Sequence, residues 1–185
     1  MKLTIVKCKP NPTGKDKDKE KPLASQLLGE TVDLKNEGDA TISLSKCRLA
    51  HTKFDTNGDP EPKPAVYWQG ASLQLKPGQT VRIHTGKSAE KDKMRSEDQL
   101  GVDYHSFSEK GTFVLNNKEG DKLYLYEEVT DGKLSLVDSA SYDKEPPEGV
   151  TLTRVGAKLI PPTKGSTSGQ PWSAPAVVGS SGKAA

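Results

Sequence analysis

The side chains that could do acid–base or metal chemistry are few and widely separated. The histidines are His51, His84 and His105, and His84 lies at the exit of a strand-like segment, where such a residue is usually structural. The sequence contains no G-x-S-x-G, H-E-x-x-H or C-x-x-C motif and no glycine-rich phosphate loop. These absences favour a protein that is not an enzyme and uses no cofactor.

One short stretch has the oxygen-rich composition of a calcium loop. Asp55, Asn57 and Asp59 place oxygen side chains at alternate positions. The register differs from that of a calcium loop, because Gly58 lies between the second and third ligand positions and Pro60 takes the turn position. A plain turn is the favoured interpretation, with a calcium site as the weaker alternative.

The two cysteines and the charge balance also indicate structural roles. Cys8 and Cys47 each lie in a segment that alternates like a strand, which favours buried free thiols over a disulfide. Lysine and arginine number 27 against 25 acidic residues, a net charge of +2. This balance lacks the strong positive charge of a dedicated nucleic-acid binder, and no stripe of alternating aromatic and basic residues suited to base stacking is evident.

Targeting signals are equally sparse. Lysines interrupt the apolar residues of the N-terminal segment, so it lacks the core of a secretory signal. No apolar run approaches the roughly 18 residues that a membrane helix needs. The default expectation is a cytoplasmic protein without membrane insertion.

Apolar residues alternate with polar ones in many short segments, the pattern of strands with one buried face. These segments are residues 3–8, 30–35, 42–44, 47–49, 73–75, 81–83, 112–115, 123–126, 134–137, 140–142 and 150–155, and residues 66–68 form a short aromatic patch. Turn residues separate them, and two tight turns predict antiparallel hairpins: 30–35 with 42–44, and 73–75 with 81–83. Residues 13–28, 51–63 and 87–102 are predicted to be long surface loops, although residues 89–95 could form a helical turn.

This pattern predicts an all-β protein, a β-sandwich or barrel with long loops. We expect a single domain over residues 1–160. Residues 161–185, rich in glycine, serine and proline, are expected to form a flexible, disordered C-terminal tail.

The order of these signals resembles the lamin tail domain family, over roughly residues 3–142. Four segments carry the resemblance: P-N-P-T-G-K-D at 10–16, G-E-T-V-D-L-K-N-E-G-D at 29–39, the strands around Pro77-Gly78, and residues 117–125 around Gly120-Asp121. The family usually has a tryptophan where this chain has Cys47, and a second aromatic where it has Leu115. The sequence contains no segment like the coiled-coil rod of a true lamin, so the resemblance is closest to stand-alone or accessory bacterial members.

The resemblance implies an immunoglobulin-like β-sandwich with long loops. It also implies a protein that binds another macromolecule, so we expect a non-enzymatic scaffold or adaptor for another protein. In the tail, Trp172, Val177 and Val178 could anchor a short interaction motif, and a spacer is the alternative interpretation. Nucleic-acid binding is the second functional candidate, in which the domain would assist a nuclease in trans.

Overall fold

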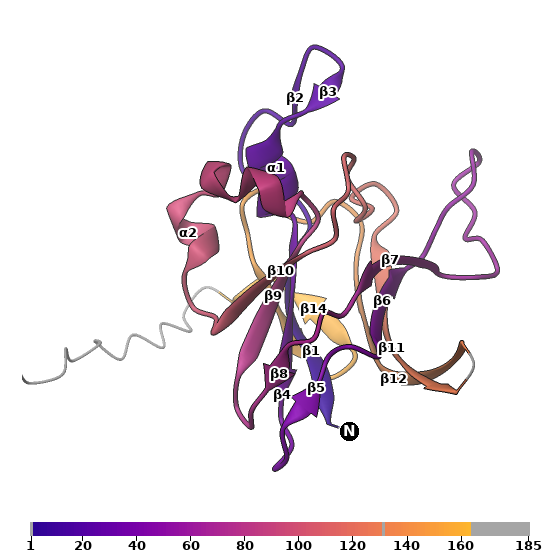
Figure 1. Ribbon diagram of the computed structural model, residues 1–185. Helices are drawn as coiled ribbons and strands as arrows, with labels where there is room; N and C mark the ends of the chain where they lie inside the picture. Colours follow the sequence, from indigo (N-terminus) through magenta and orange to yellow (C-terminus); the bar gives the residue numbers. More distant parts are fainter. Residues whose placement is uncertain (1, 131, 164–185) are drawn as a thin grey trace, which may run out of the picture.

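The computed structural model describes residues 2–130 and 132–163, and strands dominate it (Figure 1). In chain order the elements are β1 (Leu3–Lys9), β2 (Lys17–Asp18), β3 (Lys21–Pro22), α1 (Ala24–Gly29), β4 (Thr31–Asn36), β5 (Ile42–Ser43), β6 (Cys47–His51), β7 (Ala65–Gln69), β8 (Gln74–Leu75), β9 (Thr80–His84), the 3-10 helix η1 (Ser88–Lys93), α2 (Ser96–Gln99), β10 (Tyr104–Phe107), β11 (Asp121–Thr130), β12 (Lys133–Tyr142), β13 (Leu152–Val155) and β14 (Lys158–Ile160).

The longer strands form one sheet that folds over into two layers. Its order is β10-β9-β4-β1-β13-β14-β12-β11-β6-β7, so β10 to β1 make one layer and β12 to β7 the other, with β13 and β14 joining them (Figure 1). At the opposite side the indole Nε1 of Trp68, on β7, donates a hydrogen bond to the hydroxyl of Ser106, on β10, at 2.9 Å. The predicted all-β sandwich is therefore confirmed.

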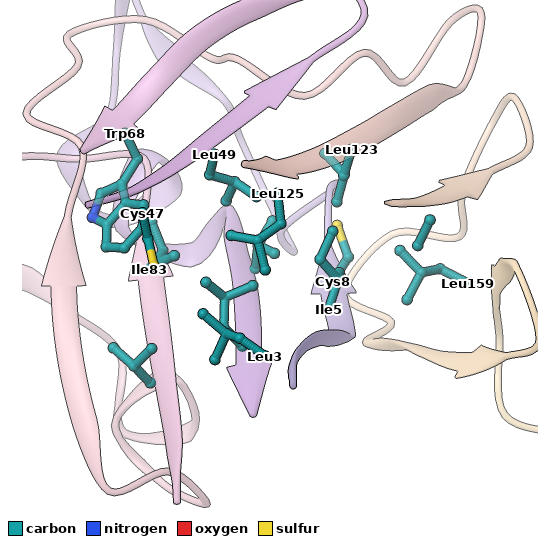
Figure 2. Packing of buried hydrophobic residues seen from close by; sticks show 14 of the residues in the cluster. Leu3, Ile5, Cys8, Cys47, Leu49, Trp68, Ile83, Leu123, Leu125 and Leu159 are labelled. Carbon is teal, nitrogen blue, oxygen red and sulfur yellow. The ribbon is translucent and has the colours of Figure 1, made fainter. Parts of the chain in front are cut away.

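The core lies between the layers and consists mainly of the inward residues of each alternating strand (Figure 2). On β1 the inward set is Leu3, Ile5 and Cys8, because a bulge between Ile5 and Lys7 shifts the alternation by one residue. Cys8 and Cys47 are buried free thiols. A second bulge places both Tyr67 and Trp68 in the core, so the large indole fills the sandwich near Cys47.

Both predicted hairpin pairings are wrong. Strand β4 pairs with β1 and β9, whereas β5 pairs with β8. The turns themselves exist: the Asn36 side-chain amide donates to the carbonyls of Ala40 and Leu75, and Gly78 adopts a positive φ of 81°. Each turn connects a strand of the large sheet, β4 or β9, to a strand of the small β5–β8 ladder, and the two strands that it joins do not pair. Strands adjacent in sequence are therefore not adjacent in the sheet.

Several predicted element boundaries also need correction. Residues 112–115 are not a strand, and residues 134–137 and 140–142 belong to one strand, β12. Strands β7, β10 and β14 were not predicted. In β7 two consecutive residues are buried, so strict alternation is absent; β10 has no fully buried residue, and β14 has only three residues. The predicted loop 13–28 contains β2, β3 and α1, and the predicted loop 87–102 contains η1 and α2. Loop 51–63 lacks a named strand or helix beyond the last residue of β6.

Candidate interaction surface

His84 is a buried ionisable residue, and both of its ring nitrogens contact neighbouring elements. Its Nδ1 lies 2.5 Å from the Leu28 carbonyl and its Nε2 lies 2.9 Å from Nδ1 of His105. If Nδ1 of His84 donates to Leu28, Nε2 accepts from His105, which accounts for both contacts with a neutral ring. Burial lowers the pKa of His84 to about 4, and the ring positions α1 against β9.

Glu30, the glutamate of the resemblance motif, lies in the core without exposure to solvent. Its Oε1 accepts hydrogen bonds from the Thr85 hydroxyl at 2.6 Å and from the Val114 amide at 2.9 Å. Burial raises the pKa of Glu30 to about 7. The carboxyl group thus holds the irregular segment 112–115, predicted to be a strand, against the sandwich.

Two buried ion pairs hold the α2 segment. Arg82 contacts both carboxylate oxygens of Asp33 at 2.8 Å and donates to the carbonyls of Asp98 and Leu100. Lys9 pairs with the Asp98 carboxylate. These anchors explain why a polar stretch without strand pattern is ordered next to the sheet.

The outer face of the β12-to-β7 layer is different, because it exposes apolar and aromatic side chains. Leu123 and Leu125 point into the core, so Tyr124 and Tyr126, which alternate with them, point outward. Tyr126 lies opposite Leu136 on β12, and Glu128 lies opposite Leu134. On the other side, Tyr124 lies opposite Ala50, which lies opposite Val66. We call Val66, Tyr124, Tyr126, Leu134 and Leu136 the outer patch.

Side-chain geometry shows that the outer patch is continuous. The Tyr124 and Tyr126 rings are nearly parallel, with centroids 6.1 Å apart, and burial raises the pKa of Tyr126. Ala50 has no exposed area although it is on this face, since its neighbours cover it. Leu136 is 54% exposed and Val66 41% exposed. Contiguous apolar surface of this kind marks interaction sites in soluble proteins.

Basic groups border the outer patch. The Lys122 ammonium lies 5.1 Å from the centre of the Tyr124 ring, and Arg48, opposite Tyr126, pairs with Glu128. Lys122, Tyr124 and Tyr126 thus form a short row of basic and aromatic side chains on β11 that was not predicted. The signal was present in the alternation of Lys122, Tyr124 and Tyr126, but the acidic residues that follow them obscured it.

The outer face of the other layer carries a polar groove. Lys7, Lys35 and Glu37 are among its lining residues, together with Arg154, which pairs with Asp138. Its mixed charges contrast with the outer patch, which we regard as the better candidate for a binding surface.

Comparison with protein families identifies this architecture. The sequence pattern described as Lamin Tail Domain matches residues 1–144. The chain belongs to the lamin tail domain family. The predicted family and its immunoglobulin-like fold are thereby confirmed. A comparison with curated proteins found no significant match.

The predicted calcium candidate of this lamin tail domain, residues 55–59, is a turn that the Asp55 side chain closes. Oδ1 of Asp55 accepts hydrogen bonds from the backbone amides of Asn57 at 2.8 Å and Asp59 at 3.0 Å. Within residues 2–130 and 132–163, no group of three or more histidine, cysteine or acidic side chains is arranged to hold a metal ion. The geometry accounts for the composition of this loop without a metal.

Two further predictions concern the C-terminal tail and membrane insertion. Trp172, Val177 and Val178 lie outside the described residues, as does the tail from residue 164 onward. No helix in the described ranges is both long and apolar enough to cross a membrane.

Proposed function

We propose that this lamin tail domain is a non-enzymatic protein-interaction module, a scaffold or adaptor that binds another protein through the outer patch. The observation that carries the proposal is the contiguous apolar surface of Tyr124, Tyr126 and Leu136 on the outer face of the sheet. Tyrosine supplies large contact area at low entropic cost, which suits it to protein interfaces.

The buried polar residues are poor candidates for a binding site, which supports the choice of the outer patch. Glu30 and His84 have the altered pKa values that catalytic sites often use, but both side chains are fully buried and hydrogen-bonded to the fold. They therefore offer no surface to a substrate. The outer patch, by contrast, is open to a macromolecule.

A capture experiment with the full chain tests the proposal. The tagged chain is used to isolate proteins from a lysate of the source cells, beside the double variant Tyr124→Ser/Tyr126→Ser. We expect the captured protein to fall at least about tenfold in the variant, since hot-spot aromatics contribute about 2 kcal/mol or more. Leu100→Ser, which alters an exposed leucine elsewhere, is the matched control.

The tail is tested in the same assay. Trp172→Ala, made in the full chain, should reduce capture if the tail supplies a second contact. Capture that survives the tyrosine double variant but is lost in Trp172→Ala would move the binding site from the sandwich to the tail. Capture unchanged in both variants would reject the proposal.

Nucleic acid is the second candidate partner, favoured by the Lys122 ammonium over the Tyr124 ring. A domain that binds phosphates in this way, with or without a nuclease partner, should lose affinity steeply between about 50 and 200 mM salt. Fluorescence anisotropy with single-stranded DNA measures this. Binding that is absent, or that does not change with salt, rejects this candidate and leaves protein binding.

A further inference from the structure

Strand β12 has a free edge at its N-terminal half. It pairs with β11 along its length, but with β14 only at Ser141. Near the middle of β12, Arg154 and the backbone amide of Ile5 both contact the Asp138 carboxylate and cover the edge there. Among the described residues, those from Lys133 to Val137 have no second strand partner. Their outward backbone amides and carbonyls are therefore available to another strand.

This free edge lacks the usual protection against pairing. Lys133, Leu134, Ser135 and Leu136 are all exposed, and between Lys133 and Asp138 the strand carries no charged residue. Edge strands that stay unpaired usually carry inward charges, prolines or bulges. Here the β11–β12 register shifts only at the two ends of the stretch: at Val137, and on β11 between Glu128 and Thr130, which lie opposite Leu134 and Lys133. The chemistry that fits the edge is an extended apolar strand.

The sequence of the edge is complementary to itself. In an antiparallel pair, directly opposite residues have side chains on the same face. If two copies pair about a two-fold axis through Ser135, Leu134 of each copy lies opposite Leu136 of the other. The four leucines then form one cluster on the outer face, and the two Ser135 side chains face each other.

Other registers are poorer. A shift that moves the axis to Leu134 places Leu136 opposite Gly132, and a shift to Leu136 places Leu134 opposite Asp138. In a register that places an even-numbered residue opposite an odd-numbered one, the leucines of the two copies would lie on different faces of the sheet. Only the axis through Ser135 buries both leucines of both copies.

We propose that two copies of this chain pair antiparallel along the β12 edge, with the two-fold axis through Ser135, to form a sheet that continues across the dimer. The interface is isologous, as expected for a two-fold dimer. It would place the two outer patches side by side on one face. The proposal goes beyond the proposed function and does not depend on an external partner.

Cysteine cross-linking tests this register. Ser135→Cys places two thiols opposite each other, with Cβ atoms about 5 Å apart, close to the spacing of a disulfide. Ser139→Cys is the matched control on the same strand, because its two copies would lie about 27 Å apart, eight residues along the strand. Cys8 and Cys47 are buried, so they contribute little background.

The full chain with each substitution is oxidised and run on a non-reducing gel, and the unmodified chain is followed by sedimentation up to about 1 mM. We expect a covalent dimer with Ser135→Cys and little with Ser139→Cys. Leu136→Asp should weaken the reversible dimer at least about tenfold, since it places two carboxylates in the leucine cluster. Circular dichroism checks that each variant is folded.

A chain that stays monomeric up to about 1 mM would overturn the proposal. So would equal cross-linking by the two cysteine variants, or a dimer unaffected by Leu136→Asp. The Tyr124→Ser/Tyr126→Ser variant should still dimerise. Partner capture that is unchanged in this variant and in Trp172→Ala, beside an intact dimer, therefore rejects only the proposed function. An unmodified chain that captures its partner but stays monomeric rejects only this inference.

Discussion

Glu30, the buried glutamate of the family motif, has a pKa that is shifted by the fold. Its carboxyl group accepts hydrogen bonds at Oε1 from Thr85 and Val114, while Oε2 is buried without a hydrogen-bond partner. Burial outweighs the hydrogen bonds and raises the pKa to about 7 from an ordinary 4.5. The folded chain therefore retains a proton that the unfolded chain has already released.

This proton makes stability depend on pH. Below pH 4.5 both states bind it, and between pH 4.5 and 7 only the folded state does, so the free energy of unfolding falls as pH rises through this window. The total loss is about 3 kcal/mol. Glu30→Gln cannot ionise, so its stability relative to the unmodified chain should increase by about this amount between pH 4.5 and 8.

Urea denaturation at several pH values measures this difference. Glu97→Gln is the control, because Glu97 is exposed on α2. The same pH dependence in Glu30→Gln as in the unmodified chain would show that Glu30 is already ionised in the fold.

At the scale of elements, the contact between β7 and β10 closes the sandwich opposite β13 and β14. The Trp68 indole is 2% exposed and reaches Ser106 from the edge of the other layer. A tryptophan here supplies both core volume and a hydrogen-bond donor. Because β10 lacks fully buried residues of its own, this contact is important for its position.

Trp68→Phe should therefore lower the free energy of unfolding by about 2–3 kcal/mol, through lost packing and an unpaired Ser106. Ser106→Ala removes only the hydrogen bond and should cost about 1 kcal/mol. Chemical denaturation gives both values. A cost below about 0.5 kcal/mol for Trp68→Phe would show that the indole does not hold the two edges together.

At the scale of the whole molecule, the sequence predicted strands better than it predicted their partners. Segments such as residues 3–8, 30–35 and 81–83 have a local period that reports a buried face. Pairing depends on contacts between distant residues, such as Lys7 with Thr153, that a local pattern does not contain. The hairpin predictions were wrong for this reason.

The outer patch could be predicted only in part. The alternation of Tyr124 and Tyr126 with buried leucines is visible in the sequence. Their proximity to Leu136 depends on the β11–β12 register, which shifts at a bulge between Leu125 and Tyr126. Val66 joins the same face through a second bulge. Bulges of one residue reverse which side chains face outward, and the sequence pattern did not reveal them.

The position of β1 in the sheet has a consequence for how the protein is made. This first strand lies between β4 and β13, and the amide of Ile5 contacts Asp138, 133 residues later. Since synthesis proceeds from the N-terminus, β1 and β4 can meet early, but one side of β1 stays open until residues 152–155 emerge from the ribosome. Closure of the sandwich is thus a late event, after the whole 1–144 region that defines the family has been translated.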